Sequence, residues 1–155
     1  MTFSFQELVT AVETYPETFL QIEIIDVDFT GNALNVNETA SFRVQVTNTG
    51  ALHITDLTVR VQGLNGATVK NSGAAAPFVS EFVSAPLDQI NAHGGVQSHL
   101  GSPFSLKAPA GAQASKNLVK VTLEDWNADQ SHIFIGHSDP LESVKATFAA
   151  AVVIS

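Results

Sequence analysis

The sequence predicts an all-β protein: an antiparallel β-sandwich of about seven to eight strands with a short N-terminal helix. From Phe19 onward, apolar and polar residues alternate over most of the chain, which is the period of strands with one buried face. Turn residues separate these segments, and the strand–helix alternation of a parallel sheet is absent. The 155 residues are enough for one ordinary domain.

Residues 1–18 carry the helical signal. Ser4 and Glu7 have the spacing of a capping box, and Pro16 ends the segment. Apolar residues recur at helical spacing here: Phe5, Leu8, Val9 and Val12. A helix of about three turns is not stable alone in water. We therefore expect it to pack on the sandwich or on a neighbouring subunit.

The sandwich itself is expected to cover residues 19–155. In its first strand the apolar residues change parity at Ile24 and Ile25, which predicts a β-bulge or a kink where the chain switches sheets. Segments 40–47 and 57–61 both alternate cleanly and are separated by turn residues. They are predicted to form an antiparallel pair.

The middle of the chain, at about 63–101, has a less regular pattern. It is rich in glycine and alanine and is predicted to be a long irregular insertion around short strands such as 78–83. Such a segment either carries function or contains strands that the pattern does not reveal. Further strands are expected at these positions: 103–107, 118–123, 131–135 and 144–154.

The last of these strands loses its polar alternation after Thr147. Two arrangements explain this pattern. The strand is either buried on both faces, or it pairs with another protomer along an exposed edge.

The composition excludes several classes of protein. Seven Lys and Arg against fifteen Asp and Glu give a net charge of −8, which argues against nucleic acid and anionic membranes as partners. The absence of cysteine excludes disulfides, thiol nucleophiles and cysteine-ligated metals. Only 14% of the residues are charged while 45% are hydrophobic, which favours extensive protein contacts.

The sequence does not identify a compartment. It has no signal-peptide pattern at its first residues and no apolar run of about twenty residues, so membrane insertion is not expected. We expect either a virion or cytoplasmic assembly protein, or a surface protein whose leader has been removed.

Two regions carry a resemblance to a known family. Residues 38–50 form a strand that ends in an Asn-Thr-Gly turn, and Ile54-Thr-Asp-Leu-Thr-Val-Arg-Val61 follows. Later, Phe104-Ser-Leu-Lys-Ala-Pro-Ala110 precedes the strand 118–123. Together these residues resemble the bacterial and archaeal immunoglobulin-like modules of the CARDB type over roughly residues 19–124; phage capsid and tail proteins carry similar modules.

That resemblance implies an immunoglobulin-like sandwich and a non-catalytic role in surface, adhesive or scaffold proteins. It supplies no catalytic residues. The long segment 63–101 and the N-terminal helix depart from the family pattern.

One motif could hold a metal ion. Asp125, Asn127 and Asp129 place oxygen ligands on alternate residues, as the first positions of a calcium loop do. Gln130 replaces the glycine of such a loop, and Gly136 replaces its closing glutamate. The alternative is a hairpin loop in which these side chains cap backbone amides.

Trp126, within the same motif, is the only tryptophan and the single candidate for stacking on a glycan. It could equally cap the end of the sandwich core. No catalytic constellation is evident: there is no nucleophile elbow, no nucleotide-binding glycine loop and no zinc spacing among the five histidines.

We therefore expect a non-catalytic structural or protein-interaction module without a cofactor. Its partners would be proteins, in a homo-oligomer or a larger assembly such as a virion, a filament or a cell-surface scaffold. The alternative is a glycan- or calcium-dependent adhesion module.

Overall fold

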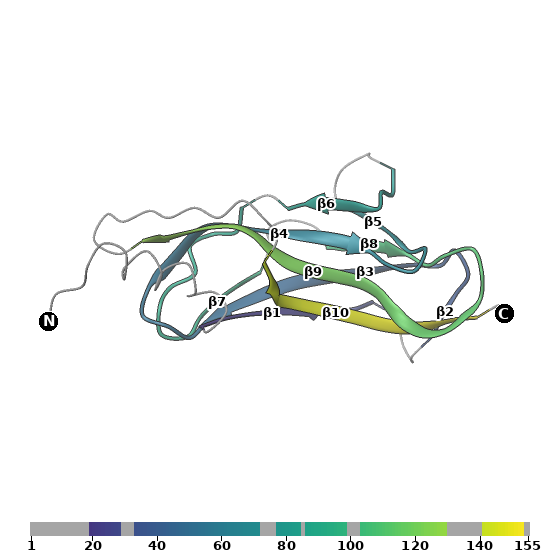
Figure 1. Cartoon of the computed structure of the whole chain (residues 1–155), viewed down its shortest axis with the longest axis horizontal. Coiled ribbons are helices and arrows are strands. Elements are labelled where there is room, and N and C mark those ends of the chain that lie inside the picture. The colour runs from purple at the N-terminus through teal and green to yellow at the C-terminus, as the bar shows by residue number, and fades with distance from the viewer. Residues whose placement is uncertain are drawn as a thin grey trace, which may run out of the picture.

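The computed structural model describes residues 19–28, 33–71, 77–84, 86–98, 103–129 and 141–153. The helix predicted in 1–18 and the strand predicted at 131–135 lie outside these residues. Within them the fold is all-β, as predicted, and its strands form two sheets (Figure 1).

The first sheet has the order β1-β3-β8-β5, with β7 pairing to β3 beside this path. Its strands are β1 (Leu20–Ile25), β3 (Thr39–Asn48), β5 (Thr68–Lys70), β7 (Gly95–Ser98) and β8 (Phe104–Lys107). All its strand pairs are antiparallel.

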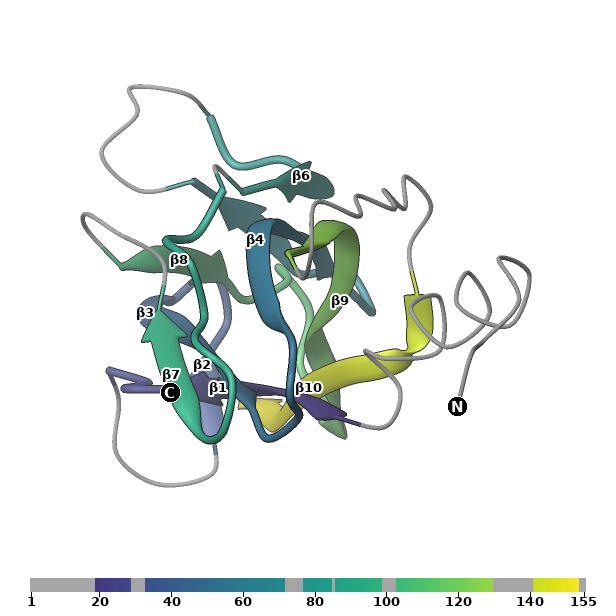
Figure 2. The same cartoon turned by 90° about the vertical axis from the view of Figure 1, so that its left-hand side faces the viewer.

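The second sheet has the order β2-β10-β9-β4-β6. Its strands are β2 (Ala33–Asn35), β4 (His53–Gly63), β6 (Glu81–Val83), β9 (Gln113–Asp129) and β10 (Leu141–Val153). Only β2 is parallel to its neighbour, β10. The view along the long axis shows the two layers from the end that carries β7 (Figure 2).

The chain switches sheets after its first strand, where the parity of the apolar residues changes. β1 ends at Ile25, Asp26 has a positive φ of 53°, and β2 belongs to the other sheet. A left-handed residue is costly except for Gly, Asn and Asp, so Asp26 suits this bend. The predicted sheet-switching kink is confirmed.

β3 and β4 do not form the predicted antiparallel pair. They belong to opposite sheets, and residues 49–52 carry the chain across the core. Alternation shows that each strand has one apolar face, but two such faces can share a core from opposite sides without any hydrogen bond between the strands.

Asn48 holds this crossing. Its side chain is fully buried, and Nδ2 donates to the carbonyl oxygens of Leu52 at 2.7 Å and Ile90 at 3.1 Å. Its Oδ1 accepts from the backbone N–H of Gly50 at 3.2 Å. The Asn-Thr-Gly turn thus connects the two sheets instead of closing a hairpin.

The segment predicted as an irregular insertion contributes to both sheets through β5, β6 and β7. Val79 exchanges two backbone hydrogen bonds of 2.8 Å with Val69 of β5, just before the same segment pairs with β4 as β6. Residues 84 and 86–90 then follow β4, with the N–H groups of Ser84, Leu87 and Ile90 donating to its carbonyls. The sequence left open whether segment 63–101 carries function or contains strands that its pattern does not reveal. Such strands account for much of the described part of this segment.

In the described part of the chain, twenty-six buried hydrophobic residues form one core cluster. Phe42 and Phe82 both meet Phe104 edge to face, at centroid distances of 5.9 and 5.1 Å. Trp126 is 1% exposed and belongs to this core.

β10 is not buried on both faces, so the first interpretation of the last strand is wrong. Val144, Ala150 and Val152 are buried, whereas Lys145 and Thr147 are exposed. Alanine occupies exposed or partly exposed positions in the second half of β10, so the sequence there does not show the alternation of apolar and polar residues. Whether this strand pairs with another protomer stays a prediction.

Candidate functional site

The calcium motif does not form the predicted tight loop. Asp125, Asn127 and Asp129 lie in strand β9, opposite Thr58, Thr55 and His53 of β4. The backbone N–H of Asp125 donates to Thr58 Oγ1 at 3.2 Å.

An extended strand separates alternate residues widely. At about 3.3 Å per residue, the Cα atoms of Asp125 and Asp129 are about 13 Å apart, whereas calcium needs its oxygens at about 2.3–2.6 Å. Among the described residues no group of three or more His, Asp or Glu could hold a metal ion. Calcium binding here stays a prediction, without the loop geometry that suggested it.

Trp126 does not offer its ring to a glycan in this arrangement. Its side chain is 1% exposed, and its indole Nε1 is buried without a hydrogen-bond partner. A sugar stacks on an accessible aromatic face, so the core position favours the other interpretation, in which Trp126 completes the sandwich interior.

An ion-pair cluster on the second sheet was not anticipated from the sequence. Arg60 of β4 binds Glu124 with Nε–Oε2 and Nη2–Oε1 distances of 2.9 and 2.7 Å, and it also contacts Glu81 of β6. The Glu124 side chain is 8% exposed and that of Arg60 is 25% exposed. Hydrogen bonds to Glu124 and Glu81 raise the pKa of Arg60 above its usual range.

This cluster joins three strands, because β4 lies between β9 and β6. Two N–H groups of the Arg60 guanidinium donate to the two carboxylate oxygens of Glu124, which is the bidentate geometry of a strong ion pair. Because Arg60 pairs with Glu124 and Glu81 within the cluster, the cluster is suited to stabilising the contact between β9, β4 and β6.

The first sheet carries a different electrostatic feature, which we name the lysine patch: Lys70, Lys107 and Phe78. The ammonium groups of Lys70 and Lys107 lie 6.0 and 5.9 Å from the centre of the Phe78 ring. Val69 and Leu106 point into the core, so their neighbours Lys70 and Lys107 project from the outer face.

Exposed carboxylates gather around the first half of β4, at what we name the acidic end: Asp56, Asp88 and Asp125. Asp56 lies in β4, and Asp125 lies in β9 opposite Thr58. Asp88 follows Leu87, whose N–H donates to Leu57 of β4. Asp56 and Asp88 are exposed and Asp125 is partly exposed.

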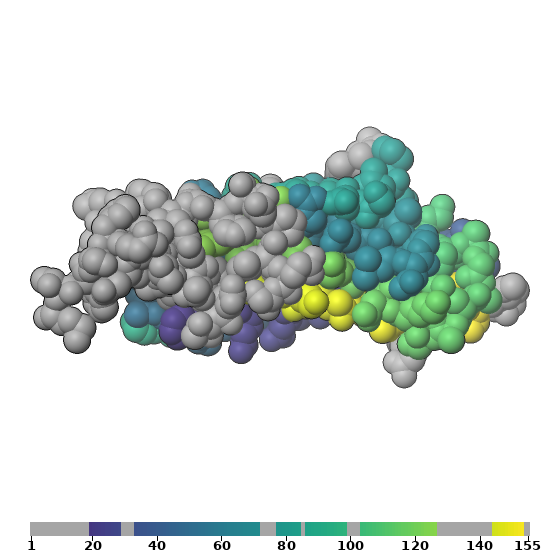
Figure 3. Space-filling view, in the orientation of Figure 1, coloured from purple at the N-terminus to yellow at the C-terminus, as the bar shows by residue number. Residues whose placement is uncertain are grey.

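Several apolar side chains remain exposed on the edges of the sheets. Val79 precedes β6 and is 37% exposed, Val83 is the last residue of β6 and is 42% exposed, and Val96 of β7 is 49% exposed. The β5–β6 region stands out above the rest of the molecule in the space-filling view (Figure 3).

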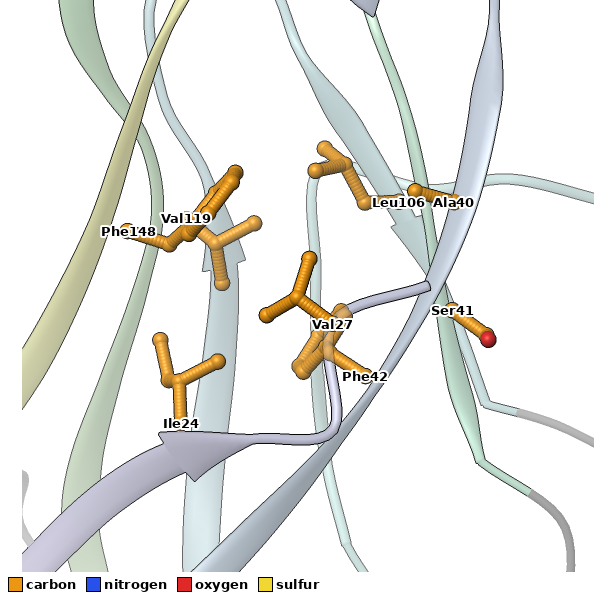
Figure 4. A pocket seen from close by; sticks show the side chains of 8 residues that line it. All are labelled: Ile24, Val27, Ala40, Ser41, Phe42, Leu106, Val119 and Phe148. Atoms are coloured by element: carbon orange, nitrogen blue, oxygen red, sulfur yellow. The ribbon is translucent and has the colours of Figure 1, made fainter. Parts of the chain in front are cut away.

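A small apolar pocket lies between the sheets beside the end of β1. Val119 and Phe148 line it from the second sheet, Phe42 from the first, and Ile24 and Val27 from the sheet-switching segment (Figure 4). It does not admit a water molecule, so it is a packing gap.

Within the described part of the chain there is no helix long and apolar enough to cross a membrane. Neither a protein-family model nor a curated protein matches the sequence.

Solved structures similar to the chain include the CARDB domain of PF1109 from Pyrococcus furiosus in solution: 15% identity, 88% of this chain and 95% of that one, TM-score 0.40. A crystal structure of that domain in complex with di-metal ions aligns over 88% and 94% of the two chains with the same identity and TM-score. The sporulation control protein Spo0M of Bacillus subtilis is 13% identical over 88% of this chain and 50% of that one, with a TM-score of 0.33. As the sequence motifs predict, CARDB domains are among the structures to which this chain is similar.

Proposed function

We propose that this chain is a non-catalytic, immunoglobulin-like protein-interaction module that acts in an assembly or on a surface, as a virion, filament or scaffold component does. The observation that carries the proposal is the set of valines left exposed on short edge segments beside a filled core: Val79, Val83 and Val96. Exposed apolar groups on sheet edges are typical of protein contact sites.

The strand order supports the immunoglobulin-like assignment. In immunoglobulin domains, strands A, B, E and D form one sheet and G, F and C the other. The orders β1-β3-β8-β5 and β10-β9-β4 reproduce those neighbours. The chain differs in one respect, because β5 in the D position precedes β6 beside β4.

The sandwich would act by rigid presentation. Val79 bonds to β5 and residues 81–84 then pair with β4, so Val79 and Val83 are held on backbone paired within the fold. A rigid backbone lowers the entropy lost when such side chains enter an interface.

The test is native mass by light scattering over a concentration series, together with binding to candidate partner particles. Val83→Lys combined with Val96→Lys should abolish association, because each variant places a charge where an apolar contact is expected. The matched control, Gln21→Lys with Ser115→Lys, adds the same charge at exposed strand positions. It should associate like the unmodified chain.

A monomer at every concentration that binds no candidate particle contradicts the proposal. So does association that the valine variant leaves intact.

A further inference from the structure

We infer that the lysine patch of one molecule binds the acidic end of a second copy of this chain, in a head-to-tail contact. The inference rests on the proposed function and names its partner. It starts from the distribution of charge on one molecule, which has positive charge at the lysine patch and negative charge at the acidic end.

The lysine patch is a compact cationic spot. Thr39, Lys107 and Thr68 form one row across β3, β8 and β5, and Ser41, Ser105 and Lys70 form the next. Phe78 extends this surface beside β5, since its neighbour Val79 pairs with Val69. The patch therefore combines two ammonium groups, an aromatic ring and a border of small hydroxyl side chains.

In the described part of the chain no carboxylate lies within ion-pair distance of the two patch lysines, although Asp28 and Glu38 border the patch on β3 through their backbone bonds to Ser41 and Ala108. Neither Lys70 nor Lys107 forms an ion pair there, whereas Arg60 on the other sheet binds two carboxylates. Glu23 lies in β1 at the other edge of the sheet. Strand β3 separates it from Lys107 in β8, and β3 and β8 together separate it from Lys70 in β5. In a chain of net charge −8, two lysines without an ion pair among the described residues are suited to an acidic surface.

The acidic end is too far away to neutralise the patch of the same molecule. Lys107 pairs with Thr39 at the start of β3, while Asn48 at its end reaches Ile90, which pairs with Ile54 of β4. Ser41, in the row of Lys70, is seven residue steps from Asn48, and Asp56 lies two steps from Ile54 back toward the patch. About five steps, or about 16 Å along the strands, therefore separate Lys70 from Asp56. That separation exceeds the screening length of about 8 Å at physiological salt.

Two complementary sites on different parts of one chain produce a heterologous contact. The patch of one copy would receive Asp56 and Asp88 of the next, so association would continue from molecule to molecule. Exposed valines near the patch, Val79 and Val83, would be covered in the same contact. The electrostatic part should weaken with salt, and the apolar part should not.

The experiment compares charge variants by light scattering at about 50 and 500 mM salt. Lys70→Glu with Lys107→Glu should raise the dissociation constant for self-association at least about 10-fold, because the contact becomes repulsive. Asp56→Asn with Asp88→Lys should do the same; Asn is used because φ at Asp56 is 54°.

Mixing the two variants is the decisive step. One retains only the acidic end and the other only the lysine patch, so together they should form a dimer that grows no further. The control Gln21→Glu, Ser115→Glu and Lys116→Glu changes the net charge by the same four units, from −8 to −12. It should associate nearly as the unmodified chain does.

The outcomes separate this inference from the proposed function. Association that survives both charge variants but is lost in Val83→Lys with Val96→Lys overturns the head-to-tail contact and leaves the proposed function standing. Loss of association in the charge variants alone supports the contact and contradicts the role of the valines. A monomer that binds inorganic polyphosphate through Lys70 and Lys107 overturns the inference as well.

Discussion

Replacing Asn48 by alanine should destabilise the sandwich by about 3 kcal/mol. The change removes three hydrogen bonds in a fully buried place: two to the carbonyls of Leu52 and Ile90 and one from the N–H of Gly50. A buried hydrogen bond contributes about 0.5–1.5 kcal/mol, and each polar group left without a partner costs about 1–3 kcal/mol. The structure around the substituted side chain relaxes in part and water enters the space, so the total loss of stability stays near the low end of what these values add up to.

Urea unfolding followed by the fluorescence of Trp126 measures this effect, because the single tryptophan is buried. A loss of about 3 kcal/mol lowers Tm by about 6–12 °C in a domain of this size. Asn48→Asp keeps the shape but replaces the Nδ2 donor by an acceptor, so it should cost at least as much.

The control is Asn117→Ala, at an exposed position of β9, which should change stability by no more than about 0.5 kcal/mol. If Asn48→Ala loses less than about 1 kcal/mol, or if Asn48→Asp is as stable as the unmodified chain, Asn48 does not hold the crossing between the sheets.

Three further outcomes are expected. Glu124→Gln should lower the free energy of unfolding by about 1–3 kcal/mol, since Arg60 keeps Glu81 but loses its main partner; an unchanged urea midpoint would contradict this. Gly63→Ala should destabilise by at least about 2 kcal/mol because its Cβ would lie 2.1 Å from the carbonyl oxygen of Ala67, whereas Gly111→Ala, with open space, should be neutral in the same melts. Calcium and chelator should give equal Tm values because β9 is extended; a calcium-dependent rise would restore the proposed site.

The strands that the sequence predicted well are those long enough to show a period. Segments 40–47 and 57–61 lie within β3 and β4, and the parity change at Ile24 and Ile25 marks the switch of sheets. β5 and β6 have three residues each, which is too short for alternation to stand out from chance.

The candidate site was harder to predict. Alternate acidic residues at Asp125 are compatible with a calcium loop or with one face of a strand, and only pairing with β4 distinguishes the two. The burial of Trp126 likewise depends on what packs around it. Lys70 of β5 and Lys107 of β8 meet in the lysine patch because these strands pair. Nothing in the positions of the two lysines along the sequence predicts this contact.

The sequence by itself determined that this chain is an all-β sandwich with its apolar residues on one face of each long strand. That information is local, because a strand repeats every two residues whatever it later pairs with. Only the tertiary structure decided that β3 and β4 belong to opposite sheets, that Trp126 is buried, and that two lysines share one ring. Those features depend on which distant segments meet, and many pairings bury the same apolar faces equally well.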